Sequence, residues 1–150
     1  MNVFCFICRH PNIVRVIEVC TTKEIYCLCL EYIQGMDLLE ALRNVGKFPE
    51  GRVKEISGQV IGAIAYLHTR KILHRDLKLE NVMLSEDRVL LIDFGLSNFW
   101  RGGQEMKTHC GSADYAAPEL IRGDVHYGPP IDIWSFGGIV HTSLITFTFY

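Results

Sequence analysis

Two polar runs on either side of a short strand-like segment constrain this chain more than any other part of its sequence. The first reads His-Arg-Asp-Leu-Lys-Leu-Glu-Asn over residues 74–81, and the second reads Asp-Phe-Gly over residues 93–95. Their side chains include the carboxylates of Asp76 and Asp93, the amine of Lys78 and the amide of Asn81. Transfer of a phosphoryl group requires a carboxylate that accepts a hydroxyl proton, a cation, and oxygen ligands for Mg²⁺. The two runs therefore predict a single site assembled from two loops.

The residues around these runs show strand-like and helix-like patterns. Runs of β-branched and apolar residues predict strands, whereas apolar positions three and four residues apart predict helices. In chain order, the expected elements are strands at 13–19 and 25–32, which form an antiparallel hairpin, helices at 36–44 and 50–70, and short strands at 72–73, 82–84 and 89–92. The last strand delivers Asp93 at its end, so the candidate chemistry lies on loops that strands hold in place.

After the second run, the sequence changes to a polar segment followed by an apolar one. From residue 95 to residue 116 it is polar and Gly-rich, which predicts a mobile segment. Gly-Pro-Pro at 128–130 then interrupts the chain. Residues 131–150 are almost wholly apolar, and they predict a helix that is buried on all sides.

Bulk composition predicts one globular domain and argues against several classes of partner. The 150 residues are 49% hydrophobic, which is enough for one sizeable core. Lys and Arg number 15 against 17 Asp and Glu, without a block of like charge, so nucleic acid and anionic membrane are not expected as partners. No apolar run reaches the length of a membrane span, and no secretory leader opens the chain. We therefore expect an intracellular, cytoplasmic protein, with the nucleus left open.

The six cysteines fit a reducing compartment. Cys5 and Cys8 have the spacing of a zinc-binding pair, but a zinc site would need a second pair. Cys27 and Cys29 alternate along a strand pattern instead. Since a free cysteine behaves as a small hydrophobic residue, we expect the cysteines to pack in apolar surroundings.

Six motifs in a fixed order make the chain resemble the protein kinase family. They are His-Pro-Asn-Ile-Val at 10–14, Glu-Tyr-Ile at 31–33, the two polar runs, Ala-Pro-Glu at 117–119 and Asp-Ile-Trp-Ser-Phe-Gly at 132–137. Any one of these motifs alone is an ordinary short sequence. Their order and spacing carry the resemblance, which a purely structural helical adaptor would leave unexplained.

The resemblance implies an α+β fold in which the chain is an incomplete kinase domain. Residues 1–30 correspond to a remnant of the small-lobe antiparallel sheet, residues 31–35 to the hinge, and residues 36–150 to an incomplete, mainly helical large lobe with the activation segment at 93–119. The family's Gly-rich phosphate-covering loop, strand lysine and helix glutamate have no counterpart in this sequence. We therefore expect a polypeptide of these 150 residues to be inactive alone. The alternative is a pseudokinase-like fragment that acts by binding partners.

The resemblance also implies ATP and Mg²⁺ as cofactors and a protein Ser or Thr hydroxyl as the substrate. Asp76 would orient and deprotonate that hydroxyl, and Lys78 would stabilise charge on the γ-phosphate. Asn81 and Asp93 would hold Mg²⁺. In this family, a lysine at the position of Lys78 marks Ser/Thr rather than Tyr specificity. An exposed ion pair in a turn is the alternative role for Asp76 and Arg75.

Alignment at the hinge implies an adenine pocket. Leu30 would be the gatekeeper beside the adenine, and the backbone of Glu31 and Ile33 would offer hydrogen bonds to it. Met83 would form the floor of the pocket. Asp37 would meet the ribose or a basic substrate residue. Plain core packing is the alternative for Leu30 and Met83.

Residues 108–119 resemble the activation segment of the calcium/calmodulin-dependent and AMP-activated kinase-like group. In that group the threonine equivalent to Thr108 is phosphorylated by an upstream kinase, and Arg75 would dock the phosphate. A solvated loop hydroxyl is the alternative for Thr108. Ser112 stands where the family usually has a threonine that bridges Asp76 and Lys78.

Further residues have structural roles in the family. His74 would pack under Phe94, and a buried histidine with satisfied hydrogen bonds is the plainer role for it. Asp132 would cap the backbone of the segment that begins at His74, which accounts for a charge in so apolar a stretch. A helix N-cap without a further role is the alternative for Asp132. Glu119 would pair with an arginine that has no counterpart in this sequence.

Overall fold

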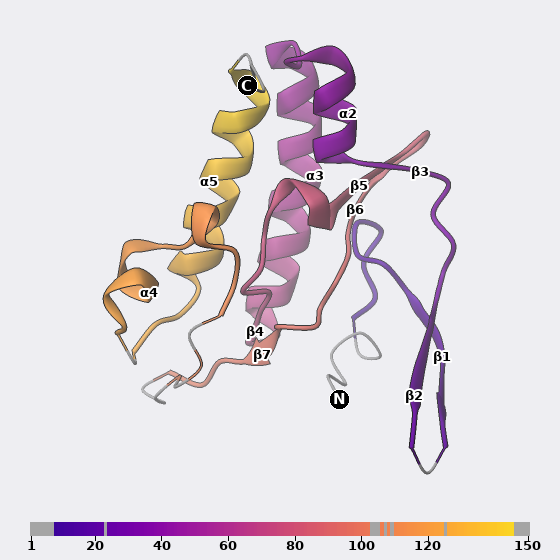
Figure 1. Ribbon diagram of the computed structural model, residues 1–150, viewed down its shortest axis with the longest axis vertical. Coiled ribbons are helices and arrows are strands. Elements are labelled where there is room, and N and C mark those ends of the chain that lie inside the picture. The colour runs from indigo at the N-terminus through magenta and orange to yellow at the C-terminus, as the bar shows by residue number, and fades with distance from the viewer. Residues whose placement is uncertain are drawn as a thin grey trace.

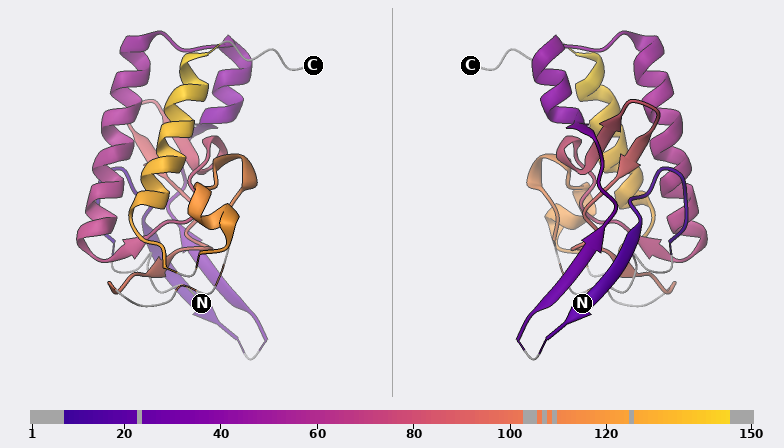
Figure 2. Two further views of the ribbon diagram at one scale, coloured as in Figure 1. Left: turned by 90° about the vertical axis from the view of Figure 1, so that its left-hand side faces the viewer. Right: turned by 90° about the vertical axis from the view of Figure 1, so that its right-hand side faces the viewer.

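The computed structural model describes residues 8–22, 24–102, 106, 108, 110–124 and 126–145. The longer helices stand side by side, and a hairpin extends away from them (Figure 1, Figure 2). Three small antiparallel sheets accompany the helices in the described part of the chain. This arrangement is the α+β architecture that the sequence predicts.

The hairpin consists of β1 (Val16–Thr21) and β2 (Tyr26–Leu30), paired antiparallel with a bulge between Val16 and Glu18. The predicted hairpin is confirmed, although its first strand begins at Val16 rather than at Ile13. Ile13 instead forms a parallel bridge with Leu91, and both side chains are buried. This bridge anchors the base of the hairpin to the core, and β2 leads directly into the predicted hinge.

Two helices follow the hairpin close to the predicted places. α2 (Leu38–Val45) begins after Asp37, whose carboxylate caps the helix by accepting a hydrogen bond from the backbone N–H of Glu40 at 2.8 Å. The predicted start at residue 36 is too early, because residues 35–37 form a strand. α3 (Glu50–Thr69) buries one helical stripe, formed by Val53, Ile56, Val60, Ala63, Ile64 and Leu67.

The central sheet positions both polar runs. β3 (Gly35–Asp37) pairs with β5 (Val82–Ser85), and β5 pairs with β6 (Val89–Leu91). The first run ends in the 3-10 helix η1 (Leu79–Asn81), directly before β5. The second run begins one residue beyond the end of β6, so that its aspartate follows a buried strand as predicted.

Leucines alternate with the polar residues of the first run and fix it to the core. Leu77 and Leu79 are each 1% exposed, and they share a buried cluster with Leu42 and Ile64. Burying a leucine stabilises a fold by roughly 1.5–3 kcal/mol relative to leaving it exposed. Lys78 lies between the two leucines in an extended conformation, with φ −157° and ψ 169°, so its side chain points away from that cluster.

The segment after the second run is more structured than its polar sequence predicts. β7 (Asn98–Phe99) pairs with β4 (Ile72–Leu73), the strand that precedes the first run. Further along lie the 3-10 helix η2 (Ala113–Tyr115) and α4 (Pro118–Arg122). A second buried cluster holds the segment in place, formed by Leu73, Met106, Ala117, Tyr127 and Ile131. Residues 103–105, 107 and 109 lie outside the described residues.

The helix α5 (Pro130–Leu144) is not buried on all sides, contrary to the sequence-based prediction. Ile131 and Ile139 are buried, but Ile133 is 45% exposed and Trp134 is 56% exposed. The exposed face borders a cavity of about 800 Å³, which is also lined by Tyr115. Because apolar residues lie on every face of this helix, the sequence pattern could not predict which face is buried. Within the described residues no helix combines the length and the apolar character that a membrane span requires; residues 146–150 lie outside them.

Candidate active site

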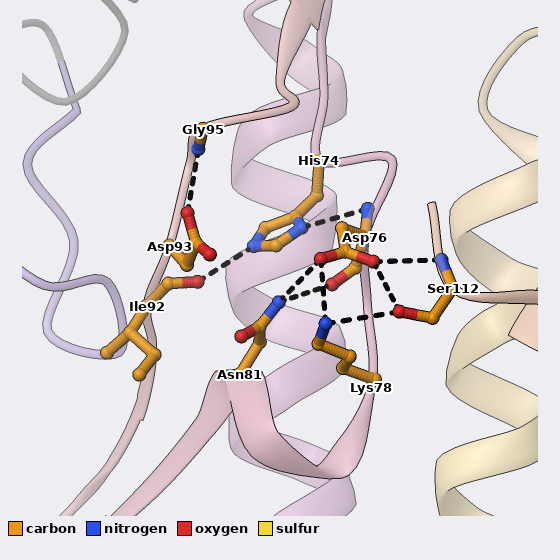
Figure 3. A network of polar contacts seen from close by, with 8 residues as sticks. All are labelled: His74, Asp76, Lys78, Asn81, Ile92, Asp93, Gly95 and Ser112. Atoms are coloured by element: carbon orange, nitrogen blue, oxygen red, sulfur yellow. Dashed lines mark hydrogen bonds and ion pairs between the residues drawn. The ribbon is translucent and has the colours of Figure 1, made fainter. Parts of the chain in front are cut away.

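Asp76 is the centre of a polar network in which both of its carboxylate oxygens have partners (Figure 3). Oδ1 accepts hydrogen bonds from the backbone N–H and from the hydroxyl of Ser112, each at 3.0 Å. Oδ2 accepts from the Asn81 side-chain amide at 3.1 Å and lies 3.2 Å from the Lys78 ammonium. Residues from both the first polar run and the predicted activation segment (93–119) thereby fix the carboxylate in one orientation.

Opposing effects set the protonation state of Asp76. Burial of the carboxyl group, which is 8% exposed, acts to raise its pKa. Hydrogen bonds from Lys78 and Ser112, together with the Lys78 charge, outweigh burial and hold the pKa of Asp76 below its ordinary value. Asp76 is therefore ionised at neutral pH, and it presents only hydrogen-bond acceptors to a substrate.

Lys78 and Ser112 form a bridge that closes the network. The Lys78 ammonium donates a hydrogen bond to the Ser112 hydroxyl oxygen at 3.1 Å, while that hydroxyl donates to Asp76. The bridge that the family makes with a threonine is thus present with serine at this position. It ties the activation segment to the first run across 34 positions of sequence.

Asn81 and Asp93 present oxygen atoms on one side of the network. The Asn81 amide nitrogen donates to the backbone oxygen of Asp76 at 2.8 Å as well as to its carboxylate, so the amide oxygen points away from Asp76. In Figure 3 this oxygen lies on the left of the amide, the side of the network on which Asp93 also lies. The exposed Asp93 carboxylate accepts one hydrogen bond, from the Gly95 backbone N–H at 2.9 Å, through Oδ1.

The donor set of Asn81 and Asp93 fits Mg²⁺. This ion prefers hard oxygen ligands, and proteins typically hold it through one or two carboxylates together with water and substrate phosphates. One amide oxygen and one carboxylate satisfy the protein's share of such a site. Among the described residues there is no cluster of three or more His, Cys, Asp or Glu side chains that could hold a metal by itself. Cys5, a member of the CxxC pair considered for zinc, lies outside the described residues.

Asp132 holds the strained backbone on which the first run begins. Its Oδ2 accepts from the His74 backbone N–H at 3.0 Å, and its Oδ1 accepts from the Arg75 backbone N–H at 2.9 Å. Arg75 has φ 68°, a left-handed conformation that costs a non-glycine residue roughly 1–3 kcal/mol. His68 adds a third hydrogen bond to the same carboxylate, from Nε2 to Oδ2 at 2.8 Å. The Asp132 carboxylate, 1% exposed, thus stabilises the turn that aims Asp76.

His74 connects the first run to the second in its neutral form. The ring is fully buried, its Nε2 lies 3.1 Å from the Ile92 carbonyl oxygen, and its centroid lies 4.8 Å from that of Phe94. Burial lowers the pKa of His74, against the opposing charge of Asp132. A neutral ring with its proton on Nε2 can donate to Ile92 and accept the Asp76 backbone N–H at Nδ1, 3.4 Å away. His74 therefore serves as a packed support between the two loops.

Tyr127 links Arg75 to the activation segment, a role that sequence reasoning missed. The Arg75 Nη1 donates to the Tyr127 hydroxyl oxygen at 3.0 Å, and that hydroxyl donates to the backbone oxygen of Thr108 at 2.7 Å. Arg75 Nε also donates to the Leu96 carbonyl at 2.6 Å. Thr108 itself is exposed. The predicted phosphate-docking cation and the predicted phosphorylation position are thus joined through one buried tyrosine.

The residues expected at the adenine belong to β2, to the segment that follows it and to the central sheet. Leu30 ends β2 and is 40% exposed, whereas Ile33 packs against the main core. The Glu31 carboxylate pairs with Arg88 at 2.8 Å. Asp37 and Met83 face each other across β3 and β5. One Asp37 oxygen already caps α2, which accounts for this residue without a ligand.

Glu119 lies apart from the Asp76 network. It belongs to α4 and lines a cavity of about 650 Å³ together with Trp100 and Tyr127. If Glu119 has the structural role predicted for it, it acts at the end of the predicted activation segment and not in the Asp76 network.

Gly111 has no room for a side chain, and this predicts a sharp effect of substitution. Its φ is +110°, and a Cβ would come within 2.6 Å of the Arg75 carbonyl oxygen. Gly123 also has a positive φ, +83°, but a Cβ there meets no atom within 4 Å. Both Gly→Ala changes carry the cost of a left-handed alanine, but only Gly111→Ala adds a backbone clash. We expect urea unfolding to show Gly111→Ala destabilised by at least about 1 kcal/mol more than Gly123→Ala; equal losses would contradict this close approach.

Comparisons with known proteins agree with the motif order. A model of the protein kinase domain family matches residues 5–150. Serine/threonine-protein kinase ppk25 of Schizosaccharomyces pombe is 44% identical over 89% of this chain and 32% of its own length. The carbon catabolite-derepressing protein kinase of Secale cereale is 44% identical over 90% of this chain and 27% of its own. A probable serine/threonine-protein kinase KIN1 homolog of Enterocytozoon bieneusi is 39% identical over 94% of this chain and 24% of its own.

The chain belongs to the protein kinase family, and the predicted family is confirmed. The relatives named above are described as protein kinases, two of them as serine/threonine kinases. The chain spans about a third or less of the length of these curated relatives.

Proposed function

We propose that this chain is the catalytic part of an ATP-dependent serine/threonine protein kinase, which transfers the γ-phosphate of MgATP to a protein hydroxyl. The observation that carries the proposal is the Asp76 network, in which Lys78, Asn81 and Ser112 all contact one buried carboxylate. A turn-exposed ion pair would be solvated on most sides. Membership of the kinase family adds support.

Asp76 acts mainly by positioning the hydroxyl of the substrate. A general base is most effective when its pKa lies near the working pH, whereas the pKa of Asp76 is held below that of an ordinary aspartate. Its ionised oxygens accept the hydroxyl hydrogen and orient the oxygen for attack. Holding the two reactants in the right geometry can supply several kcal/mol of the barrier reduction. Proton transfer to Asp76 then follows as the new bond forms.

Lys78 supplies positive charge beside the hydroxyl that Asp76 orients. Its ammonium is held by Asp76 and Ser112 at 3.2 Å and 3.1 Å, so it needs no reorganisation before reaction. Asn81 and Asp93 are the residues that would hold Mg²⁺, which when bound neutralises charge on the phosphates of ATP. Leu30, Glu31, Ile33 and Met83 are proposed to receive the adenine.

The proposal is tested in a hybrid kinase, in which residues 8–145 replace the matching segment of a related Ser/Thr kinase. We expect this hybrid kinase to phosphorylate Ser and Thr in a mixed peptide library and to leave Tyr unmodified, because Lys78 and Ser112 shape the substrate side of the site. The measurement is the identity of the phosphorylated residues by mass spectrometry. Phosphotyrosine would contradict the specificity. No phosphorylation by a folded hybrid that binds peptide would favour the partner-binding alternative.

We further propose that an upstream kinase activates the protein at Thr108. The Thr108 residue is exposed, and its backbone is joined through Tyr127 to the Arg75 guanidinium. A phosphate there would carry a charge of about −1.5 to −2 and would pair with Arg75, which orders the segment that bears Ser112.

Replacing Thr108 by Ala is therefore expected to remove activation by an upstream kinase in the hybrid kinase. A hydrogen bond to a charged group contributes about 1.5–3 kcal/mol, so activation of the parent should be on the order of tenfold to a hundredfold. The matched control is Thr69→Ala, which makes the same change at an exposed position at the end of α3 and should leave activation intact. The measurement is peptide phosphorylation before and after treatment with the activating kinase. Full activation of the Thr108→Ala variant would remove Thr108 from the scheme.

We also propose a cytoplasmic location for this activity. The described cysteines, at positions 8, 20, 27, 29 and 110, are all free thiols, which suits a reducing compartment.

A further inference from the structure

The cysteines of the hairpin do not pack in apolar surroundings, contrary to the sequence-based expectation. Cys8 is buried, but Cys20, Cys27 and Cys29 are exposed. A thiol that is exposed can exchange with small disulfides in solution, whereas a buried structural thiol is inert. None of them belongs to the Asp76 network.

The register of the hairpin gathers these thiols on one face. Cys20 on β1 lies directly opposite Cys27 on β2, and Glu18 lies opposite Cys29. Side chains two residues apart on a strand share a face. Cys20, Cys27 and Cys29 therefore share one exposed face of the hairpin with Glu18.

Distances fixed by strand geometry distinguish the three possible pairs. A disulfide requires Cα atoms about 4.4–6.8 Å apart. Directly opposite residues on antiparallel strands, such as Cys20 and Cys27, have Cα atoms about 4.5–5.5 Å apart. The diagonal neighbours Cys20 and Cys29 are about 7–8 Å apart, beyond that range. Cys27 and Cys29 follow each other along one strand at about 6.6–6.8 Å, the upper limit, with side chains roughly parallel.

We propose that Cys20 and Cys27 form a reversible redox pair, which closes as a disulfide across the β1–β2 hairpin when the thiol pool becomes oxidised. This inference is independent of the kinase activity. The bond would tie together the two strands directly before the hinge, because β2 ends at Leu30. An exposed disulfide in a reducing compartment is readily reduced again, which suits regulation more than permanent stabilisation.

A small disulfide such as glutathione disulfide can oxidise the pair in two steps of thiol–disulfide exchange. The thiolate of one hairpin cysteine attacks one sulfur of glutathione disulfide, which forms a mixed disulfide and releases one glutathione thiolate. The second cysteine gives up its proton and attacks the protein sulfur of the mixed disulfide. The Cys20–Cys27 bond forms and the second glutathione leaves. The protein loses two electrons, and glutathione disulfide is reduced to two thiols.

Cys20 is poorly suited to be the first attacker. The Glu18 carboxylate beside Cys20 raises the pKa of the Cys20 thiol, so less of it is thiolate at neutral pH. Cys20 then acts as the resolving thiol, for which its position opposite Cys27 is the decisive property.

The test is to equilibrate the 150-residue chain in glutathione buffers, alkylate the remaining thiols and identify linked peptides by mass spectrometry. Trypsin cuts after Lys23, so a closed hairpin yields two peptides joined by a disulfide. Cys27 and Cys29 lie on the same peptide, and fragmentation of its backbone between them assigns which of the two is linked. We expect two fewer of the six cysteines to react under oxidising conditions. Cys29→Ser and the control Cys110→Ser should keep the linkage, whereas Cys20→Ser and Cys27→Ser should lose it.

The ratio of the Cys20–Cys27 disulfide to the Cys20–Cys29 disulfide shows whether the folded hairpin or random pairing of thiols directs the bond. In the folded chain we expect the Cys20–Cys27 link to exceed the Cys20–Cys29 link at least tenfold. In urea the two loops close with nearly equal entropy, so the ratio should fall to within about threefold. The same peptides are measured in the hybrid kinase, whose activity reports that it is folded. A missing link there, or a link that survives Cys27→Ser and disappears with Cys29→Ser, would overturn the inference.

Discussion

Replacing Asp76 by Asn in the hybrid kinase is expected to lower kcat for a Ser/Thr peptide by about 10³-fold, with KM for that peptide changed by less than about threefold. An asparagine side chain of the same size offers one acceptor oxygen in place of two. Its NH₂ group would face either the donors of Ser112 or those of Lys78 and Asn81. The change therefore places a donor where one of the two acceptor oxygens was, which disturbs both the orientation of the substrate hydroxyl and the groups around it. Steady-state kinetics with saturating MgATP measure the effect.

The matched control is Asp87→Asn, an exposed aspartate in the turn between β5 and β6. It makes the same chemical change beside the same sheet but outside the Asp76 network, so its kcat should stay within about twofold of the parent. A kcat loss below about tenfold for Asp76→Asn would show that Asp76 does not orient the substrate. A large rise in KM with little change in kcat would assign Asp76 to binding alone.

Sequence patterns predicted the elements that carry the site because those elements are regular. α3 has an uninterrupted apolar stripe at helical spacing, and the strands around the first run are short and apolar. The alternation of leucines with polar residues in the first run also has a direct structural counterpart. Leu77 and Leu79 go into the core, so Asp76 and Lys78 are left to face the network.

Hydrogen bonds between residues that are far apart in the sequence could not be predicted from such patterns. Tyr127 lies 52 positions from Arg75, and nothing in its immediate sequence shows that its hydroxyl sits between a guanidinium and the Thr108 carbonyl. His68 resembles any histidine in the last turn of a helix until the fold brings Asp132 against it. Such contacts depend on how separate elements pack, which local periodicity does not encode.

Burial was predicted wrongly for a helix that is apolar along most of its length and for the cysteines of a two-stranded hairpin. The sequence of α5 is hydrophobic on all faces, so it could not show that Trp134 lies exposed beside a cavity. The cysteines of β1 and β2 are small hydrophobic residues by type, yet a two-stranded hairpin that extends from the core has little to bury them against.

Replacing Asp132 by Ala is expected to lower the free energy of unfolding by about 3–5 kcal/mol, the largest stability effect that we expect for any variant proposed for this chain. The carboxylate is 1% exposed and accepts from the backbone N–H groups of His74 and Arg75 and from the His68 ring. Without it, two backbone donors in a buried region lose their partner, and each costs about 1–3 kcal/mol. Arg75 would also lose the contact that holds it in its left-handed conformation.

Two further variants identify the cause of this loss. Asp132→Asn keeps one acceptor oxygen and should lose about half as much stability, because one of the two backbone donors can still be satisfied. Glu55→Ala removes a carboxylate from an exposed pair with Arg52 and should change stability by less than about 0.5 kcal/mol. Urea unfolding followed by circular dichroism provides the three values under one set of conditions. If Asp132→Ala lowered the free energy of unfolding no more than Glu55→Ala does, the carboxylate would be dispensable for the geometry of Asp76. The turn at Arg75 would then be held by the core, into which Leu73 and Leu77 pack on either side of it.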